Sequence, residues 1–206
     1  MKRILLFLSF ILLIIVITFS CERDDICPES TETTPRLIIE FYDFEDSEVL
    51  KNVPRLTVYG EGIFVDDNGV PFEPEEATDG ILLETSAGAE PTFVFNTNKN
   101  RIALPLKIAD DLGNDFVTTR FILERDTNLR LDTENPTTSN KDILEIRYNS
   151  EFIYVSRACG YKSLFNSLEV EENGNDGSLW IRNIIEDPSL ESGITNENTT
   201  HVRILH

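Results

Sequence analysis

Short runs in which apolar residues alternate across two faces recur along most of this chain and constrain its fold more than any other feature. The first run, residues 36–44, places Leu37, Ile39 and Phe41 on one face and further apolar residues on the other. This pattern is expected of a strand that is buried on both sides. No window carries the i, i+3, i+4, i+7 stripe of an amphipathic helix, so no long helix is predicted.

The later runs have similar length and apolar content, and turn signals such as Asp67-Asn68-Gly69 and Asp79-Gly80 separate them. Many short strands at this spacing predict an all-β domain, either an antiparallel β-sandwich (Ig-like or related) or an open barrel. The runs are residues 55–59, 62–65, 81–84, 92–96, 102–106, 116–125, 143–148, 152–158, 164–170, 179–185 and 201–205.

One pair of runs predicts a local pairing. Residues 143–148 and 152–158 are separated only by Asn149-Ser150, a polar pair typical of turns. We expect these runs to form a hairpin that turns at Asn149-Ser150, which places Cys159 at the end of its second strand.

Two further segments have simple interpretations. Residues 126–141 are polar and rich in Thr and Asn, so we expect a long exposed connection there. The single tryptophan, Trp180, lies between Leu179 and Ile181 and is predicted to anchor the core rather than to bind a ligand.

The N-terminus has the three regions of a secretory signal peptide. Lys2 and Arg3 form a basic start, residues 4–19 form an apolar core, and Ser20 is the small residue before Cys21. An uncleaved transmembrane helix is the alternative, because the apolar core approaches the roughly 17–25 residues that span a bilayer.

The cysteine distinguishes this leader from an ordinary signal peptide. Residues 18–21, Thr-Phe-Ser-Cys, resemble a relaxed bacterial lipobox, in which the thiol receives a diacylglycerol and the chain is cut before the cysteine. We therefore predict a lipoprotein signal peptide over residues 1–20, a lipidated tether over residues 21–35 and a single β-rich domain over residues 36–206. The lipid at Cys21 would hold the protein on a membrane.

Charge narrows the possible partners. The chain has 37 acidic and 18 basic residues, for a formal net charge of −19. Such a surface repels phosphate backbones, and no run of Lys and Arg supplies the basic stripe that nucleic-acid binding requires. The acidity is interpreted as a source of solubility, and nucleic acid is excluded as a partner.

The other two cysteines predict a disulfide. If Cys21 is acylated, Cys27 and Cys159 form an even set in an oxidising compartment. Two unrelated buried thiols are the alternative. A redox or nucleophilic role is disfavoured, because the chain has no C-x-x-C pair and no histidine near Cys159 in sequence.

The sequence carries no catalytic motif. Its only histidines, His201 and His206, lie at the C-terminus, which excludes a catalytic triad or a three-histidine metal centre. Two acidic turns, residues 66–69 and 171–177, crowd oxygen ligands suitable for calcium, but neither matches the twelve-residue calcium loop. We therefore predict no enzymatic activity, no cofactor and no metal. The alternative is an acidic hydrolase, which needs only two carboxylates of the kind found in Glu75-Glu76, Asp110-Asp111 and Glu171-Glu172.

Five short segments carry a resemblance to known proteins. They are Asp25-Ile26-Cys27, Thr34-Pro35-Arg36-Leu37-Ile38-Ile39, Asn52-Val53-Pro54, Leu104-Pro105-Leu106 and Arg157-Ala158-Cys159-Gly160-Tyr161-Lys162. Together they resemble an uncharacterised family of lipoproteins from Bacteroidota that has no assigned function. The resemblance implies one lipid-anchored domain in which Cys27 and Cys159 are family features, and it implies no activity.

These observations lead to an expected location and function. We expect lipid anchoring in the outer membrane, on its periplasmic face or at the cell surface, because residues 22–25 are a loose version of the acidic surface signal of that lineage. The expected function is that of a non-enzymatic accessory or scaffold subunit beside an outer-membrane β-barrel protein. The alternative is a β-sandwich module that binds a glycan or calcium.

Overall fold

Strands make up the regular structure of this protein. The computed structural model describes residues 26–62, 68, 70, 92–108, 116–127, 139–173, 178–188, 190 and 193–206. These residues form nine strands and contain no α-helix. The strands are β1 (Leu37–Tyr42), β2 (Val53–Gly60), β3 (Thr92–Lys99), β4 (Arg101–Leu104), β5 (Val117–Arg125), β6 (Asn140–Ser156), β7 (Gly160–Glu172), β8 (Asn183–Glu186) and β9 (Val202–Leu205).

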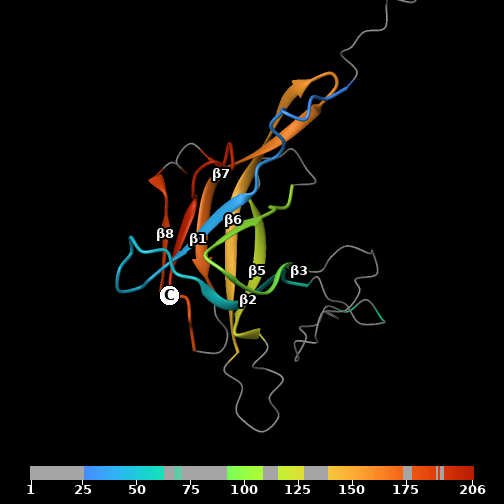
Figure 1. The fold of residues 1–206 in the computed structure, drawn as a ribbon. Helices are drawn as coiled ribbons and strands as arrows, with labels where there is room; N and C mark the ends of the chain where they lie inside the picture. The colour runs from blue at the N-terminus through green and yellow to red at the C-terminus, as the bar shows by residue number, and fades with distance from the viewer. Residues whose placement is uncertain are drawn as a thin grey trace, which may run out of the picture. The chain divides into compact units, whose positions relative to one another are not determined.

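The strands form two sheets, which confirms the predicted all-β class and is consistent with a β-sandwich rather than a closed barrel (Figure 1). One sheet has the order β4-β1-β9-β8 and the other the order β3-β2-β5-β6-β7. The pairs β1–β4, β2–β3, β2–β5, β5–β6 and β8–β9 are antiparallel, whereas β1 and β9 pair in parallel with Ile39 opposite Val202 and Phe41 opposite Ile204. The C-terminal strand therefore lies inside its sheet, between β1 and β8.

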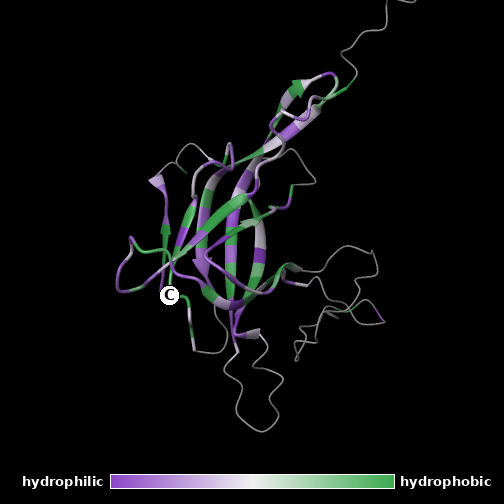
Figure 2. Cartoon of the chain, viewed as in Figure 1, coloured by the Kyte–Doolittle hydropathy of each residue, from purple (hydrophilic) through white to green (hydrophobic). Residues whose placement is uncertain are grey.

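One hydrophobic core draws its side chains from both sheets. Leu37, Ile39 and Phe41 enter it from β1, as the alternation of residues 36–44 predicts. Figure 2 shows β1 as hydrophobic along almost its whole length. Full burial of a large apolar side chain contributes about 1.5–3 kcal/mol, so this strand is a major source of stability. The opposing sheet contributes Leu56, Val58, Phe121, Leu123, Leu144 and Ile146.

Trp180 is a core anchor, as predicted. Its side chain is 2% exposed, and its indole Nε1 donates a hydrogen bond to the Leu123 carbonyl at 3.2 Å. The buried carboxylate of Asp142 accepts hydrogen bonds from the backbone N–H groups of Trp180 (2.9 Å) and Ile181 (2.7 Å). The Asp142 side chain therefore holds the segment that leads into β8, where a buried N–H group without a partner would be costly.

The hairpin predicted at Asn149-Ser150 is wrong. Strand β6 runs unbroken through both residues, and the chain turns instead at residues 157–159 before β7. Among the described residues, positive φ occurs at neither Asn149 nor Ser150, whereas Gly160 adopts a φ of 71°. Tight hairpin turns need such left-handed backbone, which glycine takes at no steric cost.

The long exposed connection predicted over residues 126–141 is only partly described by the structure. Thr127, in the segment expected to be exposed, is buried, and its hydroxyl donates a hydrogen bond to the Arg55 carbonyl at 2.9 Å. The predicted connection is also too long, because β6 already begins at Asn140, and residues 128–138 lie outside the described residues. The predicted strand at residues 81–84 and all but Gly62 of the one at residues 62–65 lie outside them as well.

Contacts divide the chain into two compact units. The described residues 26–33 and 153–162 form one unit, and the described residues within 34–152 and 163–206 form the other. The core described above belongs to the second unit. The prediction of a single domain over residues 36–206 stays a prediction.

His201 joins β1 to the segment before β9. Its side chain is 2% exposed, and its Nδ1 accepts a hydrogen bond from the Ile38 N–H at 2.9 Å. The His201 N–H donates in turn to the Ile38 carbonyl at 3.0 Å. Burial lowers the pKa of the His201 imidazole below its ordinary value of 6.5, because the charged form is poorly solvated there.

We predict that the protein loses stability as the pH falls below about 6.5, because the unfolded chain then binds a proton that folded His201 resists. For one such group the slope is at most about 1.4 kcal/mol per pH unit. Urea unfolding at pH 7.5 and pH 5.5 measures the loss. His201→Asn keeps an acceptor near the Nδ1 position and should show a smaller loss over the same interval. An unchanged pH dependence in this variant would contradict the assignment.

Candidate functional site

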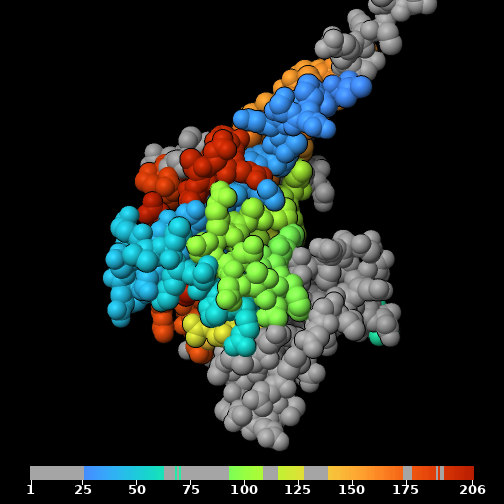
Figure 3. All heavy atoms as spheres, in the orientation of Figure 1, coloured from blue at the N-terminus to red at the C-terminus, as the bar shows by residue number. Residues whose placement is uncertain are grey.

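The unit formed by residues 26–33 and 153–162 is the candidate functional site, and we call these described residues the clamped tip. It consists of the end of β6, the turn before β7, the first residues of β7 and the segment that follows the predicted lipidation site. In Figure 3 the two parts, coloured blue and orange, lie against each other. A covalent bond, an ion pair and polar contacts join them.

The covalent bond is the Cys27–Cys159 disulfide, which the sequence predicts and the structure contains. The two Cα atoms lie 4.8 Å apart, although the cysteines are separated by 132 positions in sequence. Cys159 lies in the turn before β7 rather than at the end of a second hairpin strand, which corrects its predicted position.

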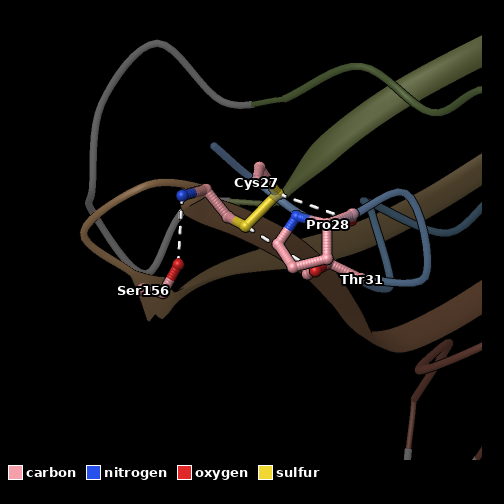
Figure 4. The surroundings of a disulfide bond; sticks show 5 residues. Cys27, Pro28, Thr31 and Ser156 are labelled. Atoms are coloured by element: carbon pink, nitrogen blue, oxygen red, sulfur yellow. Dashed lines mark hydrogen bonds between the residues drawn. A yellow bond between two sulfur atoms is a disulfide. The ribbon is translucent and has the colours of Figure 1, made fainter. Parts of the chain in front are cut away.

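Polar groups surround the disulfide (Figure 4). The Ser156 Oγ accepts a hydrogen bond from the Cys159 N–H at 3.0 Å, which closes the turn. The Thr31 hydroxyl lies 3.7 Å from the Cys159 Sγ. Because a disulfide sulfur carries no proton, the hydroxyl is the donor in this weak contact. The turn at residues 157–159 is therefore held by Ser156 at the end of β6 and by Thr31 of the N-terminal segment.

An ion pair provides a second link within the clamped tip. The Lys162 Nζ lies 3.0 Å from the Glu32 Oε2. The Glu32 side chain is 69% exposed, so solvent screens the pair and its contribution to stability is small. The disulfide is thus the dominant connection between the two parts.

Large apolar and aromatic side chains of the clamped tip face solvent. Ile26 is 81% exposed, Tyr154 57% and Tyr161 68%. The two tyrosine rings form an edge-to-face pair with centroids 5.4 Å apart. Such a pair holds its rings in a defined geometry. A shallow depression beside the disulfide is lined by Ile26, Pro28, Thr31 and residues 155–159.

The clamped tip is electrically balanced within an acidic protein. Its acidic residues are Glu29 and Glu32, and its basic residues are Arg157 and Lys162. The whole chain has a formal net charge of −19. The tip therefore repels an anionic or zwitterionic surface less than the remainder of the chain does.

The remaining predicted site residues are Cys21 and the two acidic turns. Cys21 lies outside the described residues, as do most of both acidic turns proposed for calcium. Within the described part of the chain, no group of three or more His, Cys, Asp and Glu side chains is placed to hold a metal ion. The same part of the chain contains no helix long and apolar enough to cross a membrane.

Sequence reasoning missed Tyr154 and Tyr161 as candidate functional residues. Tyr154 lies in a run that indicates a strand and Tyr161 lies between two such runs, and alternation alone does not reveal which residues of a strand stay exposed. The useful signal was Gly160, because it marks the turn that joins the strand of Tyr154 to the strand of Tyr161.

Residues 56–206 match the model of a family described as a family of unknown function, DUF6452. The matched residues include Cys159 and both tyrosines but begin after Cys27. No curated protein and no solved structure matches the chain.

We predict that replacing both bridged cysteines, Cys27→Ser with Cys159→Ser, lowers the free energy of unfolding by about 2–4 kcal/mol. The bridge closes a long loop, so its loss increases the conformational entropy of the unfolded chain. Urea unfolding followed by Trp180 fluorescence measures the change. A reductant should destabilise the wild-type protein by a similar amount and leave the double variant unaffected. Equal stability of the two proteins would contradict a clamping role.

Proposed function

Because the chain belongs to this family of unknown function, we propose a function from its own residues: a lipid-anchored protein of the bacterial cell envelope that serves as a non-enzymatic accessory subunit of an outer-membrane protein complex. The observation that carries the proposal is the disulfide that clamps the segment after Cys21 to the β6–β7 turn. The lipoprotein character and the outer-membrane location are part of this proposal.

The disulfide supports export. Such bonds persist in oxidising compartments such as the bacterial periplasm and are rare in the reducing cytosol. The signal-peptide pattern of residues 1–20 predicts the same destination. Two independent features, one in the leader and one in the folded chain, therefore favour a location outside the inner membrane.

The position of the bridge supports anchoring by lipid at Cys21. Cys27 follows Cys21 by six positions, so the clamp begins almost at the proposed anchor. A lipoprotein that acts at the membrane surface benefits from this arrangement, because its folded part stays near partners embedded in the same membrane.

The roles of the two histidines support a non-enzymatic function. His201 is buried and bonded to the backbone of Ile38. The ring of His206 packs edge-on against Phe41 and Trp180, and its Nε2 lies 3.3 Å from the Lys51 carbonyl. Burial lowers the pKa of both imidazoles, so each remains neutral and structural rather than serving as an exposed proton carrier.

We predict that the protein incorporates labelled fatty acid in bacterial cells and that Cys21→Ala abolishes this incorporation, because the thiol is the proposed acceptor of the diacylglycerol. Gel electrophoresis and mass spectrometry of the membrane fraction measure the label. Cys27→Ala is the matched control and should retain it. Label that persists in Cys21→Ala would refute anchoring at this residue.

We also predict that chemical crosslinking of intact cells, followed by gentle solubilisation and pull-down, recovers the protein with an integral outer-membrane protein. A lipid anchor raises the local concentration of such a partner, so a modest interface is sufficient. Cys21→Ala should recover much less of it. Recovery of the protein alone at every crosslinker concentration would argue against an accessory role.

A further inference from the structure

The clamped tip exposes an edge-to-face pair of tyrosines and the side chain of Ile26, which follows the proposed lipid anchor by five positions. We propose that Tyr154, Tyr161 and Ile26 insert into the lipid headgroup region, so that the tip makes a second contact with the membrane that holds the lipid. This inference rests on the proposed function, because it takes the anchor at Cys21 as its premise.

The exposure of these side chains is the first argument. Ile26, Tyr154 and Tyr161 are 81%, 57% and 68% exposed, although they belong to one compact unit. A tyrosine ring has an apolar body and a polar hydroxyl, which is why tyrosine is enriched where membranes meet water. Isoleucine adds apolar area that is favourable to bury beneath the headgroups.

The short reach from the anchor is the second argument. Six peptide units separate Cys21 from Cys27, so even a fully extended segment spans only about 20 Å. The disulfide places the Cα atom of Cys159 4.8 Å from that of Cys27, and this brings the β6–β7 turn under the same restriction. The tip is therefore confined near the membrane surface at a high effective concentration, which makes even a weak contact significant.

Charge is the third argument. The balanced charges of the tip leave little electrostatic repulsion between it and a lipid surface, in contrast to the acidic chain as a whole. The segment between Cys21 and Ile26 contains Glu22, Asp24 and Asp25 against Arg23, so it adds no attraction to anionic lipid. The contact should therefore depend on apolar and aromatic insertion, and it should persist in neutral lipid and at high salt.

The test uses the full chain with the lipid on Cys21, purified from membranes and reconstituted in phosphatidylcholine vesicles. Tyr161→Trp adds a reporter at the tip, and brominated phosphatidylcholine quenches tryptophan that enters the bilayer. Trp180 is 2% exposed, so the difference from the wild-type protein isolates the new emission. Phe93→Trp is the matched control, because Phe93 is an exposed aromatic residue, 42% exposed, outside the clamped tip.

We expect brominated lipid to remove a several-fold larger fraction of the added emission in Tyr161→Trp than in Phe93→Trp, with little change between low and high salt. Equal quenching of the two variants, or none in Tyr161→Trp, would overturn the proposal. The proposal would also fail if the emission added by Tyr161→Trp were unquenched in vesicles but shielded from solvent in native membranes. That result would assign the tip to a protein partner.

The failures of the two proposals are distinguishable. Mass spectrometry of the purified protein shows whether Cys21 carries lipid before any quenching is measured. An unmodified protein refutes the anchor itself. A lipidated protein with an unquenched tip refutes only the membrane contact.

Discussion

The pairing of β9 with β1 is the constraint on which the rest of the fold depends. β9 lies between β1 and β8, so the first sheet has no continuous hydrogen-bond ladder until the last residues of the chain are in place. His201 reinforces this junction through both polar groups of the Ile38 backbone. Because the partners come from opposite ends of the domain, closing this contact costs substantial chain entropy. The buried side chains Val202 and Ile204 offset that cost by completing the core.

The sequence predicted the strands well because each strand has a local cause. Alternation over residues 36–44 follows from the period of two in a strand, and it identified the core-facing side chains of β1 correctly. The pairing of strands depends on residues far apart in the sequence, so the parallel pairing of β1 with β9 could not be predicted from periodicity. The false hairpin at Asn149-Ser150 has a related cause. A polar pair resembles a turn wherever a long strand such as β6 has half-buried positions, and the real turn lies just before Gly160, where the backbone is left-handed.

The candidate site was only half predictable. If Cys21 is acylated, the two remaining cysteines form an even set, and this parity predicted the Cys27–Cys159 bridge without any geometry. The exposed pair of Tyr154 and Tyr161 was not indicated, because the exposure of a strand residue depends on whether a second layer covers it. Composition describes the whole chain, whereas the charge balance of the clamped tip becomes visible only when residues 26–33 and 153–162 are known to form one unit.

The order of attachments along the chain has a mechanical consequence. A lipid at Cys21 would transmit any pull on the protein into the residues that follow it, and β1 begins soon afterwards at Leu37. Without a bridge, that pull would act on the end of β1, the strand on which the first sheet depends. With the bridge, part of the force passes from Cys27 through the disulfide to Cys159. The load is then shared with the hydrogen-bonded strands β6 and β7, and β1 bears less of it. A disulfide next to the proposed anchor would therefore protect β1 and the sheet to which it belongs.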